Sequence, residues 1–138
     1  MVDQKVLLSR TEQIEEHLKR IRAYEKMPLK DFLKDRDARD IVEYNLFQIV
    51  NHLIDMIQHI VVDEEYGYPQ SAYEACQILC DQKVLTSRDL HILKKMIGFR
   101  NIVGHDYISL NKEVPHEILK KGKKDIETLV GRITRRFL

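Results

Sequence analysis

The chain has 138 residues, of which 43% are hydrophobic and 33% are charged, and its formal net charge is +1. This length fits one domain, residues 1–138, and the hydrophobic content excludes a disordered chain. The near-neutral charge excludes a generally basic nucleic-acid-binding protein but remains compatible with a local basic cleft.

The first half of the chain has the periodicity of helices. Apolar residues spaced by seven, four and three predict a first helix, which Pro28 ends. They are Leu7, Ile14, Leu18 and Ile21. A charged connection with room for a helical turn follows at 29–40 (LKDFLKDRDARD). The next helix is the longest, and the loop at 66–69 (YGYP) follows its end.

This longest helix carries two apolar rows, which predict a central position in the fold because the rows require several packing partners. The first row is Val42, Leu46, Ile49, Leu53, Met56 and Ile60. The second row is Val50, Ile54, Ile57 and Val61.

Three further helices are predicted in the second half. Ser71 fits an N-cap, with Glu74 completing a capping box, and this helix runs to about Asp81. The segment 86–89 (TSRD) opens the fourth helix, and Pro115 fits the first turn of the fifth. No segment shows sustained strand alternation, and the chain has only five glycines and three prolines. We therefore predict an all-α antiparallel bundle of four to five helices.

The sequence also predicts a cytoplasmic protein without membrane contact. No apolar run approaches the roughly 18 residues that span a bilayer, and residues 1–10 lack the apolar run of a secretory signal. Cys76 and Cys80 lie four residues apart on a predicted helix, which is poor geometry for a disulfide. Both are therefore expected to be reduced thiols in the core.

The segment 98–107 (GFRNIVGHDY) combines side chains suited to phosphodiester chemistry. Arg100 can hold a phosphate through two parallel hydrogen bonds, and His105 can exchange protons near neutral pH. On an ideal helix they point roughly 140° apart, so they do not share a face. They can reach one phosphate if the helix distorts or ends near Gly104, or if a second subunit supplies one group. Alternatively, the segment is an ordinary helix C-terminus.

Arg100, His105 and Tyr107 match the R-x4-H-x-Y motif of HepT-like toxins in the HEPN superfamily, which the chain resembles over residues 3–135. The flanking sequence KKMIGFRNIVGHDY, the helix around Leu46 and the following loop resemble that family as well. One departure precedes the motif histidine, where a glycine replaces a residue that is often larger in relatives.

The resemblance implies a homodimeric ribonuclease toxin whose arginine and histidine line a cleft between subunits. Arg100 would stabilise the scissile phosphate, and His105 would act as general acid or base. Tyr107 would receive AMP from an MntA-type minimal nucleotidyltransferase antitoxin, and the added bulk and negative charge would block the cleft. Asn101 and Asp106 are further candidates for orienting these groups.

The implied reaction starts with attack of an RNA 2′-OH on the adjacent phosphate. It requires no metal and no cofactor, and DNA should resist because it lacks this hydroxyl. Both tRNA and mRNA are candidate substrates. The alternative function is a non-catalytic helical module that binds a minimal nucleotidyltransferase, and a plainer alternative is a helical dimer whose motif only caps a helix.

A polar stripe runs along the longest helix beside its apolar face. Its members are Asn45, Gln48, His52, Asp55 and His59. One helix lacks the spread of ligands that a tetrahedral metal site needs, so no metal is expected. Asp55 can pair with His59 one turn later. Asn45 and Asp55 are predicted to support the cleft or the dimer contact, against the alternative of a solvated or interhelical polar face.

Three basic clusters are candidate RNA contacts. They are Lys94 with Lys95; Lys120, Lys121, Lys123 and Lys124; and Arg132, Arg135 and Arg136. For the last cluster we favour a solvated helix end, because cations stabilise a helix C-terminus.

Overall fold

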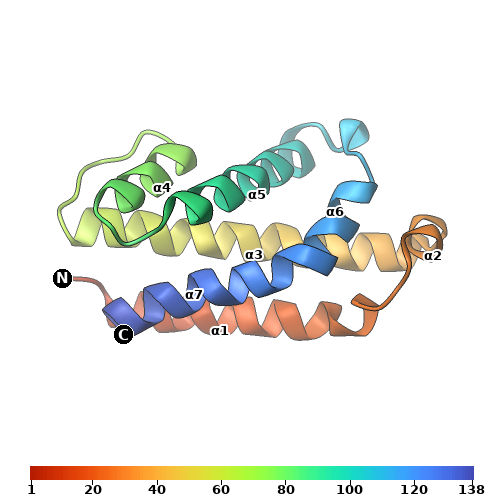
Figure 1. Ribbon diagram of the computed structural model, residues 1–138, viewed down its shortest axis with the longest axis horizontal. Helices are drawn as coiled ribbons and strands as arrows, with labels where there is room; N and C mark the ends of the chain where they lie inside the picture. The colour runs from red at the N-terminus through yellow and green to blue at the C-terminus, as the bar shows by residue number, and fades with distance from the viewer.

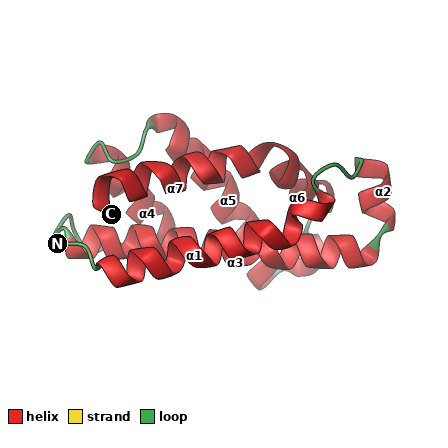
Figure 2. Ribbon diagram, turned by 90° about the horizontal axis from the view of Figure 1, so that it is seen from below, coloured by secondary structure: helices red, strands yellow, loops and turns green.

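The computed structural model describes residues 1–138 as a bundle of helices without strands, which confirms the predicted all-α fold (Figure 1). The longer helices are α1 (Gln4–Ile21), α3 (Arg36–Asp63), α4 (Ala72–Asp81), α5 (Ser87–His105) and α7 (Lys123–Phe137). Two short helices, α2 (Leu29–Lys34) and α6 (Glu113–Glu117), lie before α3 and α7. Seen from below, α7 lies along one side of the bundle, and the layer that contains α1 and α3 lies along the other side (Figure 2). No helix has the length and apolar character needed to cross a membrane.

Helix α3 lies at the centre, as its two apolar rows predict. It contacts α1 on one side and α4 and α5 on the other (Figure 1). Every residue of the two rows is at most 4% exposed, and these residues belong to one core cluster of 32 buried side chains. Removing this apolar surface from water is the main force that holds the bundle together.

The first helix ends earlier than predicted. Helix α1 ends at Ile21, and a 3-10 turn follows at Arg22–Tyr24. Leaving the helix here lets Tyr24 and Met27 pack against the core. The prediction that Pro28 ends this helix is therefore wrong. Pro28 instead precedes α2, where its fixed φ of −62° and missing N–H are tolerated. The predicted charged connection thus contains a true helix, α2.

Of the two helices whose N-cap is a serine or a threonine, only one has a closed capping box. The Ser71 hydroxyl accepts a hydrogen bond from the Glu74 N–H (3.0 Å), as predicted. The Glu74 carboxylate, however, accepts from the Gln70 N–H (3.1 Å) instead of the Ser71 N–H, so the predicted reciprocal bond is wrong. At α5 both bonds form between Thr86 and Asp89, at 2.9 and 3.1 Å.

The predicted fifth helix is interrupted. Between α6 and α7 the chain forms a π-helical turn at Ile118–Gly122. Gly122 is buried there, and an added Cβ would lie 3.1 Å from the Ile118 Cγ2 atom. Across this wider turn, Leu119 and Ile126 both face the core and are 1% exposed.

The two cysteines are free and differ in exposure. Cys76 is fully buried, whereas Cys80 is partly exposed. Burial raises the pKa of the Cys76 thiol to about 12. At pH 8 only about one Cys76 thiol in ten thousand is then ionised. We expect a thiol reagent to label Cys80 in the native protein and Cys76 only after unfolding, as measured by peptide mass spectrometry. Equal native labelling rates would contradict this expectation.

Candidate functional site

The motif arginine and histidine lie on one unbroken helix. Helix α5 continues past Gly104 to His105, and the Asp106 N–H closes its last turn on the Ile102 carbonyl at 2.8 Å. The helix thus ends near Gly104, as one predicted alternative has it, but both Arg100 and His105 still lie within the helix, so this ending does not bring them onto one face. By helix geometry they are separated by about 7.5 Å along the axis and by roughly 140° around it.

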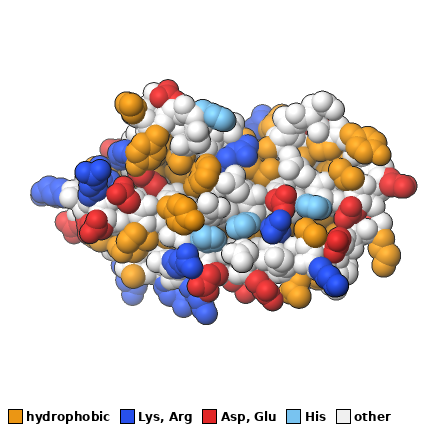
Figure 3. Space-filling model, turned by 180° about the vertical axis from the view of Figure 1, so that it is seen from behind, with side chains coloured by type: hydrophobic (Ala, Val, Ile, Leu, Met, Phe, Trp, Pro, Cys, Tyr) orange, Lys and Arg blue, Asp and Glu red, His pale blue; other side chains and the backbone are white.

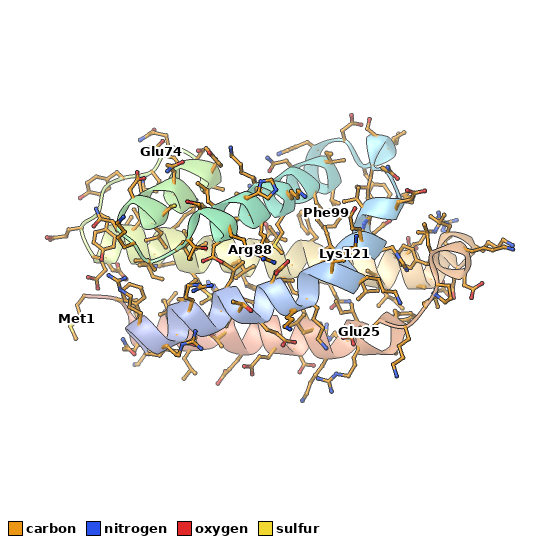
Figure 4. The ribbon with its side chains drawn as sticks, in the orientation of Figure 1. Met1, Glu25, Glu74, Arg88, Phe99 and Lys121 are labelled. Atoms are coloured by element: carbon orange, nitrogen blue, oxygen red, sulfur yellow. The ribbon has the colours of Figure 1, made fainter.

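Both side chains are free to bind an external group. Arg100 is half-buried, and its Nε atom is buried without a hydrogen-bond partner. His105 is exposed at the end of α5. Neither takes part in an ion pair within the chain. Phe99, labelled in Figure 4, is 2% exposed and fixes this part of α5 to the core. A fixed, unpaired guanidinium is suited to binding a phosphate.

Tyr107 lies just beyond α5, in a 3-10 turn at Tyr107–Ser109. Its side chain is 44% exposed, and its hydroxyl donates a hydrogen bond to the Glu43 carboxylate on α3. The Lys112 ammonium lies 3.7 Å from the Tyr107 ring centroid and 3.4 Å from the other Glu43 carboxylate oxygen. Three chain segments thus meet around this tyrosine.

Glu43 and Lys112 are not among the residues that the sequence predicts for the site. Glu43 had a recognisable signal, because it lies seven residues before Val50 and therefore continues the second apolar row of α3. A charged residue in an apolar row requires a partner when it is buried, and Glu43 is 3% exposed. Lys112 has no such signal, since it lies in a turn between the 3-10 turn at Tyr107–Ser109 and α6.

The two neighbouring candidates in the motif are both exposed. Asn101 lies on α5, one residue after Arg100. The Asp106 carboxylate accepts a hydrogen bond from the Ser109 hydroxyl at 2.6 Å, which closes the turn that carries Tyr107. Orientation of the reacting groups by these two residues stays a prediction.

Asn45 and Asp55 face α1 and do not join Arg100. The Asn45 side chain is 4% exposed, and its Oδ1 atom lies 2.8 Å from the His17 Nδ1 atom. Asp55 forms an ion pair with Arg10, and its other oxygen lies 3.8 Å from His59, which confirms the predicted i,i+4 pair. These contacts fit the interhelical alternative, and support of a cleft or dimer contact stays a prediction.

Histidine side chains line the α3 region on the face shown in Figure 3. The His52 ring stacks on that of His17, with centroids 5.7 Å apart and planes inclined by 27°. No group of three or more His, Cys, Asp or Glu side chains is arranged to hold a metal ion. Burial lowers the pKa of His52, His17 and Arg10 lower it further, and Asp55 raises it.

This lowered pKa predicts that the protein loses stability in mild acid. Below the ordinary histidine pKa of about 6.5, the unfolded chain binds a proton at His52 more readily than the folded chain. The free energy of unfolding should therefore fall as the pH decreases from about 6.5 through the folded-state pKa of His52. Above about pH 6.5, the contribution of His52 to this free energy should be constant. Urea unfolding between pH 5 and 8 should show a smaller loss for His52→Gln than for the parent. Parallel pH curves for the two proteins would disprove the assignment to His52.

The basic clusters differ in how much of their charge is used within the chain. In the last cluster, Arg132 pairs with the buried Asp89 of α5 at 2.9 Å and Arg136 donates to the Lys83 carbonyl at 3.2 Å, so these two arginines bind other segments of the chain instead of forming a purely solvated helix end. The second cluster borders a surface hollow of about 470 Å³. Its lining includes Glu25, Lys26, Lys120, Lys123 and Lys124. Figure 4 labels Glu25 and Lys121 at this end of the bundle.

Comparisons with known proteins agree in sequence and structure. A family model described as "Ribonuclease HepT-like" matches residues 14–133. The chain is 31% identical over 99 residues to the mRNA nuclease HepT of Shewanella oneidensis, covering 72% of this chain and 74% of that protein. A solved structure of the tri-AMPylated Shewanella oneidensis HEPN toxin in complex with MNT antitoxin has a TM-score of 0.88 at 27% identity, covering 96% of this chain and 99% of that one. YutE from Bacillus subtilis, at 17% identity and a TM-score of 0.83, covers 98% and 90% and shows the fold alone.

Proposed function

The chain belongs to the HepT-like ribonuclease family, and from this premise we propose that it is a metal-independent ribonuclease that acts through Arg100 and His105. One observation carries the assignment of these residues, namely that both are unpaired on the last turns of α5. The HepT relative is an mRNA nuclease, which makes mRNA the first substrate to test and tRNA the second.

We further propose that two copies of the chain build the site. Because α5 is unbroken, Arg100 and His105 of one copy point to different sides of the helix. A second copy placed against this helix end would supply the missing group. The predicted homodimer is therefore a requirement of the proposed chemistry.

In the proposed reaction an RNA 2′-OH attacks the adjacent phosphorus. His105 accepts the hydroxyl proton as the new oxygen–phosphorus bond forms, and Arg100 neutralises the charge that develops on the phosphate. The bond to the 5′-oxygen breaks and this oxygen takes the proton from His105, which leaves a 2′,3′-cyclic phosphate and returns His105 to its starting form. Every step uses groups of the protein and RNA alone.

Tyr107 is the proposed site of control by an MntA-type nucleotidyltransferase antitoxin. The related HEPN toxin is AMPylated in its complex with MNT antitoxin. Tyr107 is 44% exposed and only two residues from His105. AMP attached to Tyr107 would place a negative charge beside groups that must bind an RNA phosphate, and would repel the substrate.

Incubation of the unmodified protein with mRNA and with total tRNA in EDTA tests this function. Cleavage by the parent, with none by Arg100→Ala or His105→Ala, is the expected result. If the parent leaves both RNAs intact, the ribonuclease proposal is wrong. The second candidate, a non-catalytic module that binds a nucleotidyltransferase, would then be favoured.

A further inference from the structure

A buried carboxylate holds the hydroxyl of the motif tyrosine. Glu43 is 3% exposed, and burial of a carboxylate is costly unless both oxygens find partners. One oxygen accepts the Tyr107 hydroxyl hydrogen, whereas the other accepts no hydrogen bond and is compensated only by the charge of the Lys112 ammonium 3.4 Å away. A carboxylate has no hydrogen to donate, so the Tyr107 hydroxyl is the donor in this hydrogen bond.

This arrangement leaves the tyrosine oxygen able to react. Because the Tyr107 hydroxyl uses its hydrogen toward Glu43, the oxygen lone pairs remain available. The residue is 44% exposed and its hydrogen bond to Glu43 is only partly buried, so a reagent can approach the tyrosine from solvent. Lys112 lies 3.7 Å from the ring centroid, where a cation is attracted by the ring and favours negative charge on it. A nucleophile, a base and a cation thus occupy one cluster.

We propose that Glu43 is the base that accepts the Tyr107 proton during nucleotidyl transfer, and that Lys112 stabilises the resulting phenolate. This role rests on the proposed function of Tyr107 as the AMP acceptor. The phenolic oxygen attacks the α-phosphorus of ATP, and the proton moves to Glu43 and then to water. An oxygen–phosphorus bond forms, and the bond to pyrophosphate breaks. The acceptor protein thereby contributes to its own modification.

A chemical electrophile tests Glu43 without any antitoxin. An aryl sulfonyl fluoride forms a sulfur–oxygen bond with tyrosine and releases fluoride, with the same loss of the phenolic proton. We expect Tyr107 in Glu43→Gln to react about 100-fold more slowly than in the parent at pH 7. Between pH 6 and 9 the variant rate should rise about tenfold per pH unit, because only ionised phenol reacts, whereas the parent rate should change little.

The matched variant Lys112→Gln disrupts the same cluster but keeps the base. It should react more slowly than the parent while retaining the shallow pH profile. Tyr68, which is 82% exposed, serves as an internal reference whose labelling should be the same in all variants. A merely structural role for Glu43 would leave the pH profile unchanged in Glu43→Gln and would overturn the proposal. A steep profile in the parent itself would also overturn it, even if the variant failed to fold.

Transfer of AMP by the cognate MntA-type antitoxin, measured by mass spectrometry, separates this proposal from the function on which it rests. Slower transfer to Glu43→Gln than to the parent is expected. Equal transfer to both proteins would overturn the role of Glu43 and leave Tyr107 as the acceptor. Absence of AMP on parent Tyr107 would overturn the proposed control of the ribonuclease, while the sulfonyl fluoride rates would still decide whether Glu43 acts as a base.

Discussion

Replacing His105 or Arg100 by alanine should lower the rate of RNA cleavage at least about 100-fold, since loss of a general acid or base typically costs about 10²–10⁴ in rate and loss of a group that stabilises developing charge about 10²–10³. His105 is exposed and unpaired, so its removal should change stability by less than about 0.5 kcal/mol. RNA cleavage in EDTA, measured alongside thermal unfolding, separates loss of chemistry from loss of folding. An active His105→Ala protein would remove the histidine from the mechanism.

Mixing these two inactive variants tests whether two copies share one site. If Arg100 of one subunit acts with His105 of the other, each mixed dimer contains one complete site and one site that lacks both groups. Random mixing in equal amounts should then restore about a quarter of the parent activity, by counting sites in a dimer. If both groups act within one chain, no complete site forms and activity should stay absent.

The mixing experiment needs two controls. His91→Ala, on the exposed face of the same helix, should retain most activity and shows that α5 tolerates a substitution. Light scattering should give twice the chain mass for the parent and both inactive variants. A monomeric but active parent would contradict the shared site, because the unbroken helix keeps Arg100 and His105 apart.

The helices themselves could largely be predicted, whereas their ends could not. The two apolar rows of α3 repeat with the helical period over five turns, and such a pattern has no other way to bury its side chains. Pro28 and the box at Ser71 were placed incorrectly because each end depends on contacts with other segments. Helix α1 ends before Pro28 because Tyr24 packs against the core. The box at Ser71 stays open because the Gln70 N–H takes the Glu74 carboxylate that the box needs.

In the candidate site, likewise, the residues that are close in sequence could be predicted, whereas the residue that is distant in sequence could not. Arg100, His105 and Tyr107 lie within eight residues, so their chemistry could be recognised in the sequence. Glu43 lies 64 residues before Tyr107, and only the packing of α3 against the end of α5 brings the two together. The polar stripe that includes Asn45 was also visible, but periodicity does not tell which neighbouring helix a stripe faces.

Replacing Tyr107 by phenylalanine should separate the ribonuclease from its control. Phenylalanine lacks only the oxygen that would carry AMP, and Arg100 and His105 remain in place. With antitoxin and ATP present, the parent should lose cleavage activity as AMP accumulates, whereas Tyr107→Phe should retain it. Cleavage rate and intact-protein mass, followed over the same time course, measure both effects.

Tyr44→Phe is the matched control, because Tyr44 is 55% exposed on α3 and forms no hydrogen bond with Glu43. This variant should be modified and silenced like the parent. Tyr107→Phe also leaves one oxygen of the buried Glu43 without its partner, which should cost about 1–3 kcal/mol of stability. Cleavage must therefore be compared below the unfolding transition of both proteins. If antitoxin and ATP silenced Tyr107→Phe as fully as the parent, the antitoxin would act by binding or at another residue, because no acceptor oxygen is left at position 107.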